Sequence, residues 1–71
     1  MGLNMQIILN GKSYYTKFER ITIHELLSEL NIGTSNFAIA LNMNVIPSSK
    51  YHELWLNNND NVEIVTAFQG G

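Results

Sequence analysis

The pair Gly70-Gly71 ends the sequence, so its second member carries the terminal carboxylate. Glycine has no Cβ and can lie extended in a narrow channel where larger side chains would clash. A partner enzyme could admit such a tail and act on the carboxylate at its end. Chance places two glycines at one terminus in about one chain in 200, because glycine makes up about 7% of residues. The pair therefore indicates a reactive tail if a folded domain precedes it, with Gly71 carrying the reacting atoms.

Two His-Glu pairs, His24-Glu25 and His52-Glu53, are the other residues that suggest chemistry, either as metal ligands or as an acid–base pair. Neither has the H-E-x-x-H spacing that places two imidazoles on one face of a helix. The chain has no cysteine, which excludes a thiol nucleophile, a disulfide framework and a cysteine-bound zinc site. The sequence also lacks a glycine-rich phosphate loop. We expect both histidines in solvent, no metal site, and a protein that is not itself an enzyme.

Length and composition narrow the class of protein further. Seventy-one residues with 45% hydrophobic side chains are typical of one small folded domain. The four basic residues are scattered and the net charge is -2, which argues against a nucleic-acid partner. No apolar run approaches the roughly 20 residues that span a bilayer, so we expect no membrane partner and a cytoplasmic protein. Charged residues make up only 14% of the chain, which suits a partly apolar docking surface.

The first part of the chain predicts a β-hairpin. Two strand-like runs, residues 5–9 and 12–18, flank the dipeptide Asn10-Gly11. Asn-Gly between two such runs is a strong hairpin signal, because both residues tolerate positive φ. Side chains alternate in the second run, with Tyr14, Thr16 and Phe18 on one face and Ser13, Tyr15 and Lys17 on the other. One of these faces is expected to pack inward.

A helix is predicted next, with a defined start and end. Thr22 and Glu25 have the spacing of a capping box, in which each side chain binds a backbone amide at the helix start. An apolar stripe with helical spacing follows, formed by Ile23, Leu26, Leu27 and Leu30. Asn31 and Gly33 both accept a left-handed conformation and are expected to end the helix.

The second half of the chain predicts three further short strands. Residues 37–41 form an apolar run, and a turn at 42–44 leads to residues 45–46 and Pro47, which cannot donate to a sheet. One helical turn within residues 51–56 is expected to place Tyr51, Leu54 and Trp55 against the core. A polar turn at 57–61 precedes the last strand, residues 62–67.

The first and last strands are apolar on both faces at several positions, which is typical of central strands. We therefore expect residues 5–9 and 62–67 to lie side by side and parallel. A mixed sheet packed on one main helix is an α+β domain of the β-grasp, or ubiquitin-like, class.

The chain resembles the sulfur carrier proteins of thiamine biosynthesis, the ThiS type, over nearly its whole length. The matching motifs are Thr22-Ile23-His24-Glu25-Leu26-Leu27, Ala40-Leu41-Asn42 with Val45-Ile46-Pro47, and Asp60-Asn61-Val62-Glu63-Ile64-Val65-Thr66-Ala67-Phe68-Gln69-Gly70-Gly71. Two positions depart from the pattern of that family. Ser48 stands where a basic residue is frequent, and Asn59 stands where glycine is common, although Asn also tolerates positive φ.

The resemblance implies a role for the carboxyl-terminal tail. Residues 1–71 would form one carrier domain, with a flexible tail from about residue 67. An E1-like adenylyltransferase (ThiF type) would activate Gly71 with ATP, and a sulfur donor such as a cysteine desulfurase would convert it to a thiocarboxylate. Thiazole synthase (ThiG type) would receive the sulfur. The carrier itself would bind no cofactor, since the nucleotide site belongs to the partner. The tail residues expected to bind partners are Phe68, Gln69 and Gly70.

Several alternatives stay open on sequence alone. A molybdopterin synthase small subunit uses the same thiocarboxylate chemistry, and a ubiquitin-like modifier would instead form an amide with a lysine. A β-grasp binding module would not need its terminal glycines at all. Phe68 fits two interpretations, since an aromatic residue beside a strand end either packs on the core or anchors a partner.

Overall fold

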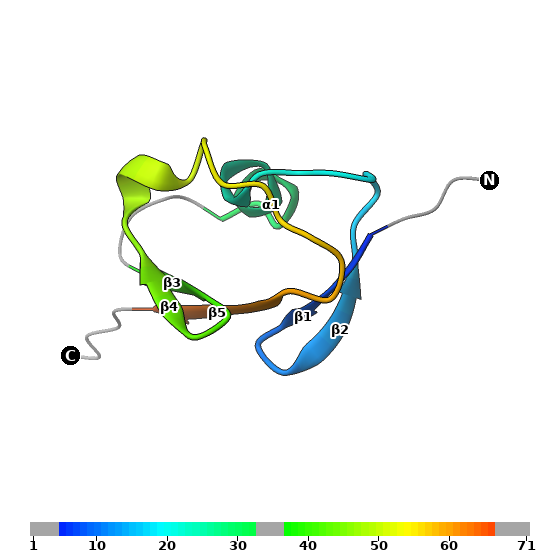
Figure 1. Ribbon diagram of the computed structural model, residues 1–71, viewed down its shortest axis with the longest axis horizontal. Coiled ribbons are helices and arrows are strands. Elements are labelled where there is room, and N and C mark those ends of the chain that lie inside the picture. The colour runs from blue at the N-terminus through cyan, green and yellow to red at the C-terminus, as the bar shows by residue number, and fades with distance from the viewer. Residues whose placement is uncertain (1–4, 33–36, 67–71) are drawn as a thin grey trace.

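The computed structural model describes residues 5–32 and 37–66 (Figure 1). These residues form a mixed β-sheet and one short α-helix. Within these residues the sheet has five strands in the order β2-β1-β5-β3-β4. The elements are β1 (Gln6–Leu9), β2 (Lys12–Tyr15), α1 (Ile23–Glu29), β3 (Phe37–Leu41), β4 (Asn44–Ile46), the 3-10 turn η1 (Ser48–Lys50) and β5 (Asn61–Thr66). No helix in the described ranges is long and apolar enough to cross a membrane.

The sheet topology confirms the predicted β-grasp fold. Strands β1 and β5 pair in parallel at the centre of the sheet, with Leu9 opposite Val62. The other neighbouring strands are antiparallel, with β2 paired to β1 and β3 paired to both β5 and β4. Helix α1 covers one face of the sheet, and no element formed by residues 5–32 and 37–66 covers the opposite face (Figure 1).

Both hairpin turns have a left-handed backbone at their two central residues. Asn10 and Gly11 have φ angles of 50° and 84°, as the Asn-Gly signal predicts. Asn42 and Met43 have φ angles of 51° and 73° in the turn between β3 and β4. Asn59, in the polar turn before β5, also has a positive φ of 71°. Asparagine therefore provides the turn geometry at three of these positions.

Helix α1 begins with the predicted capping box. The Thr22 hydroxyl accepts from the Glu25 amide at 3.1 Å, and the Glu25 carboxylate accepts from the Thr22 amide at 2.9 Å. Asn31, with a φ of 63°, follows the helix end as expected. Gly33, the other predicted terminator, lies outside the described residues. The helix and the sheet enclose a buried apolar core formed by Met5, Ile7, Ile21, Ile23, Leu26, Leu27, Ile39, Tyr51, Leu56 and Val62.

Strand β2 is shorter than the predicted run of residues 12–18. Strand β2 ends at Tyr15, and the Phe18 side chain is half exposed. Thr16 is fully buried, and its hydroxyl accepts from the Phe18 amide at 3.1 Å and donates to the Phe18 carbonyl at 2.7 Å. This side chain–backbone turn bends the chain before the alternation reaches residue 18.

The prediction for residues 51–56 was correct for Tyr51 and wrong for Trp55. The helical turn begins earlier, at Ser48–Lys50, and turn hydrogen bonds continue to Leu54, which packs partly buried against the core as expected. The backbone then becomes extended and pairs with the segment before α1 at Trp55. The amide of Leu56 donates to the Ile21 carbonyl at 2.9 Å. Side chains of an extended segment alternate, so Leu56 is buried while Trp55 points outward and packs under the Arg20 guanidinium, 4.3 Å from the ring centre.

Candidate functional site

The predicted site residues at the carboxyl terminus lie outside the described part of the chain. These residues are Phe68, Gln69, Gly70 and Gly71. The structure does describe β5, the strand that leads to them. The position of this strand determines which part of the body the predicted tail follows.

Strand β5 is paired with β3 from Val62 to Thr66, and with β1 at its first two residues. It lies between β1 and β3, and its last residue, Thr66, pairs with Phe37. Beyond the end of β1, the Asn10 side chain continues the pairing, since its Oδ1 accepts from the Ile64 amide at 2.8 Å. Val62 is fully buried against the core. The tail therefore starts from a central strand fixed by the fold.

A polar network fixes the other end of β5. The Asn42 Oδ1 atom accepts from the Asn61 amide at 2.8 Å, and the Asn42 amide group donates to an Asp60 carboxylate oxygen at 3.1 Å. The second Asp60 oxygen accepts from the Asn57 amide at 2.8 Å. These bonds tie the β3–β4 turn to the start of β5, so the hairpin and the strand form one unit.

The sheet face opposite α1 carries a strip of small and apolar side chains. The register places Ala38 opposite Val65, and Ala40 opposite both Val45 and Glu63. Val45 and Val65 are 73% and 60% exposed, and Met43 at the turn is 85% exposed. We call the set the outer strip; it consists of Ala38, Ala40, Met43, Val45 and Val65. The low charge content of the sequence indicated a docking surface without locating it. The structure places these apolar residues along β5, from Met43 near the start of this strand to Val65 near its end.

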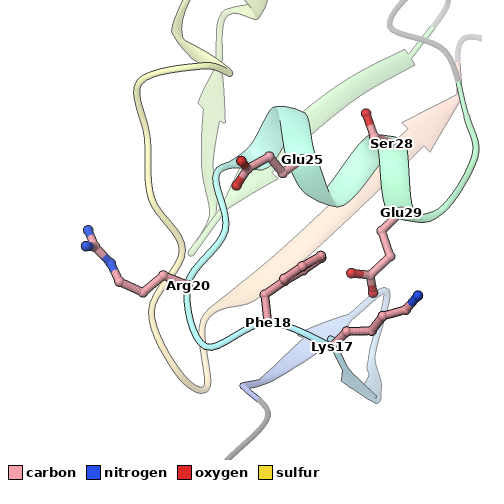
Figure 2. A pocket seen from close by; sticks show the side chains of 6 residues that line it. All are labelled: Lys17, Phe18, Arg20, Glu25, Ser28 and Glu29. Carbon is pink, nitrogen blue, oxygen red and sulfur yellow. The ribbon is translucent and has the colours of Figure 1, made fainter.

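A separate hollow of about 500 Å³ opens between helix α1 and the segment that precedes it (Figure 2). Its walls are mixed in charge and are formed by Lys17, Phe18, Arg20, Glu25, Ser28 and Glu29. Figure 2 shows Arg20 pointing away from Phe18 and Glu29. The segment between β2 and α1 lies at the opposite end of the long axis from the end of β5 (Figure 1). The hollow is therefore remote from the end of β5.

One hydrogen bond near this hollow perturbs a titratable group. The Tyr14 hydroxyl donates to Glu29 Oε2 at 2.5 Å. This bond, together with burial and the negative charge of Glu29, raises the pKa of Tyr14 from 10.0 to about 12. Glu29 Oε1 is buried and accepts no hydrogen bond from the described residues. The carboxylate of Glu29 thus holds the Tyr14 phenol in its protonated form.

Replacement of Glu29 by Gln is expected to lower the pKa of Tyr14 from about 12 toward 10.0, because an amide carries no charge. Folded Tyr14 keeps its proton above the pH at which the unfolded chain loses it. Wild-type stability should therefore fall by at most about 1.4 kcal/mol per pH unit between pH 10 and about 12, and the variant should lose less. Carbon NMR titration of the tyrosine Cζ atoms measures the pKa. Glu53→Gln, at an exposed site in another segment, should leave Tyr14 unchanged.

His52 is exposed as expected, His24 is half-buried, and the imidazole rings of the two residues stack on each other. The centroids of His24 and His52 lie 3.9 Å apart, with an angle of 26° between the ring planes. Across residues 5–32 and 37–66, no group of three or more His, Cys, Asp or Glu side chains is arranged to hold a metal ion. The sequence could not predict the contact, because it joins helix α1 to a turn 28 positions later.

Comparison with known proteins gives a consistent assignment. The uncharacterized protein ycf40 of Porphyra purpurea is 31% identical over 68 residues, which cover 96% of this chain and 94% of that protein. A thiazole synthase of Paramagnetospirillum magneticum is 30% identical over 67 residues, but these cover only 20% of its length. The crystal structure of a thiamine biosynthesis protein (ThiS) from Geobacter metallireducens superposes with a TM-score of 0.82 at 26% identity, over 94% of this chain and all of that one.

The ThiS family matches residues 7–71, a range that includes both the described β-grasp body and the predicted tail. The strand order and the central position of β5 agree with this match, as does the likeness to the Geobacter metallireducens structure. The chain belongs to the ThiS family, whose members are small sulfur carriers of thiamine biosynthesis and not enzymes.

Proposed function

We propose that this chain carries sulfur as a thiocarboxylate on Gly71. The observation that supports this most is the family match, which runs through the diglycine to residue 71. A free carboxylate is a poor electrophile, because its charge is delocalised and oxide is not a leaving group. The Gly71 carboxylate attacks the α-phosphorus of ATP, which releases pyrophosphate and forms an acyl-adenylate. AMP is then the leaving group for sulfur.

The sulfur step balances with a persulfide as donor. The terminal sulfur of the persulfide attacks the Gly71 carbonyl carbon, and AMP leaves with the electrons of the broken bond. A thiol then attacks the remaining sulfur–sulfur bond on the donor side. A disulfide forms there, and Gly71 is released as the thiocarboxylate. Every catalytic group in this scheme belongs to partner proteins, and the carrier contributes the electrophilic carbon.

The length of the tail limits where the partner enzymes bind. Five residues, 67–71, follow the last residue of β5, Thr66. An extended chain spans at most about 3.4 Å per residue, so the Gly71 carboxylate lies within roughly 17 Å of Thr66. An enzyme that encloses this carboxylate must therefore contact the body around the end of β5. Ala38 and Val65, at one end of the outer strip, supply an exposed apolar surface at that place, and the strip continues from there to Met43.

The partners follow from the same chemistry. We assign adenylation to an E1-like, ThiF-type enzyme that binds the ATP, and sulfur supply to a donor such as a cysteine desulfurase. A ThiG-type thiazole synthase is the recipient. The thiazole synthase of Paramagnetospirillum magneticum supports the last assignment, because a segment similar to this chain occurs within its own sequence. The family favours the thiamine pathway over a molybdopterin synthase subunit or a lysine-linked modifier.

Sulfur loading in vitro tests the proposal. Incubation with the cognate adenylating enzyme, ATP and a persulfide donor should change the intact mass by one oxygen-to-sulfur exchange. Omission of ATP should leave the mass unchanged, because AMP is the leaving group. An unchanged mass with an enzyme preparation that loads another ThiS protein would contradict the proposal. Higher-mass lysine conjugates in cells would instead identify a protein modifier.

A further inference from the structure

The two hairpin turns of this protein have nearly the same backbone but different residues. Both loops are two residues long, and the first central residue is asparagine in each, with φ of 50° at Asn10 and 51° at Asn42. The second residue is Gly11 in one turn, at φ 84°, and Met43 in the other, at φ 73°. Turns with positive φ at both positions strongly favour Asn-Gly. If turn geometry alone determined the residue types, the second turn would therefore be expected to contain Asn-Gly, as the first does.

Contacts within the described body do little to stabilise Met43 in this conformation. A side chain at positive φ brings its Cβ close to the backbone carbonyl oxygen, a clash that glycine avoids. The Met43 side chain is 85% exposed, the highest exposure among the large exposed apolar residues. Packing within the described body does not offset the strain. A residue held in an unfavourable conformation at an exposed position is a candidate for contact with a partner.

The position of Met43 connects it to the outer strip. It lies in the turn between β3 and β4, the strands that carry Ala40 and Val45, and this strip runs along the sheet to Val65 near the start of the tail. Methionine is unbranched and flexible, and it is frequent on surfaces that adapt to their partners. The position and the residue type both suit a docking contact at the far end of the strip.

We propose that Met43 is the adaptable apolar contact by which a thiazole synthase docks on the outer strip, an inference that rests on the proposed function. The occupant is a thiazole synthase because a relative with that name contains a similar segment in the same chain. Glu63 lies opposite Ala40 on the strip and is exposed. The matching surface on the enzyme is therefore an apolar pocket with a basic side chain at its rim.

Replacement of Met43 by Gly tests this inference, because it should move stability and affinity in opposite directions. Relief of the strained turn should raise the melting temperature by roughly 4 °C. Loss of the apolar contact should weaken binding to the cognate thiazole synthase about tenfold. Calorimetry of the full chain with the purified enzyme measures the dissociation constant. A misfolded variant cannot give this combination, since misfolding lowers the melting temperature.

Two further variants complete the experiment. Met43→Leu keeps an apolar side chain and the strain, so it should bind within about threefold of wild type at an unchanged melting temperature. Phe18→Ala removes an exposed apolar group beside the remote hollow and should bind as wild type does. Wild-type affinity of Met43→Gly, or an equal loss in Phe18→Ala, overturns the inference. Sulfur loading of the wild-type chain is measured separately, so failure of the proposed function is distinguished from failure of this docking contact.

Discussion

Removal of Gly71 is expected to abolish sulfur loading while the free energy of unfolding stays within about 0.5 kcal/mol of the full-length value. The shortened tail moves the terminal carboxylate back by about 3.4 Å. A misplacement of about 1 Å in an active site can lower a rate about a hundredfold, so loading should fall by at least that factor. Intact-mass analysis after incubation with the adenylating enzyme, ATP and a persulfide donor measures the loss.

The reason for so large an effect is that the reacting atoms belong to the last residue and the body has no means to compensate. Strand β5 is fixed between β1 and β3 and cannot shift outward to restore the reach of the tail. Addition of one alanine after Gly71 should be equally damaging, because the carboxylate then overshoots. Removal of residues 2–4 is the matched control, since the family match begins at residue 7. Loading of the Gly71 deletion within twofold of wild type would refute a terminal thiocarboxylate.

Local chemistry in the sequence predicted the elements whose geometry depends on adjacent residues. The capping box of Thr22 and Glu25 forms as expected, because both partners lie within one helical turn. The Asn10-Gly11 hairpin forms because both residues tolerate the required φ. The parallel pairing of the first and last strands was also predicted correctly, since strands that are apolar on both faces belong at the centre of a sheet.

Predictions failed where a contact distant in sequence overrides the local pattern. Trp55 was placed in the core as part of a helical turn, but the backbone around it pairs with residues 21–23 and becomes extended. The alternation then directs this side chain outward, where it meets Arg20. Phe18 is exposed for a related reason, because the Thr16 hydroxyl bends the chain before the strand pattern is complete.

The candidate site likewise has one part that was predicted from the sequence and one part that was not. The reactive tail was predicted from the sequence, because a terminal diglycine is a local feature. The outer strip was not, because it depends on the register between β3 and β5, which brings Ala38 beside Val65 across 27 positions. Hydrophobic content alone gives neither the face nor the pairing of these residues. The strain at Met43 likewise depends on a φ angle that the sequence does not show.

Replacement of Ile39 by Ala is expected to cost about 2–5 kcal/mol of unfolding free energy, the range measured for large-to-small changes in packed cores. Ile39 is fully buried in β3, with Ile46 opposite it on one side and Ile64 on the other. A domain of this size has only about 3–5 kcal/mol of stability from its single core, so a large fraction of the variant should be unfolded. Urea unfolding followed by circular dichroism measures the change.

Val45→Ala is the matched control, because it also deletes methyl groups from the sheet but at a side chain that is 73% exposed. Its cost should stay below about 1 kcal/mol, since little buried surface is lost there. The dependence of the unfolding free energy on urea concentration should be the same in both variants, because both expose the same chain. Equal destabilisation of the two would contradict a core on the helix side of the sheet.

In Ile39→Ala the Gly71 carboxylate is intact, so the folded fraction should load sulfur at the wild-type rate. Total loading should then fall only in proportion to the unfolded fraction, which distinguishes a stability defect from the chemical defect of the Gly71 deletion.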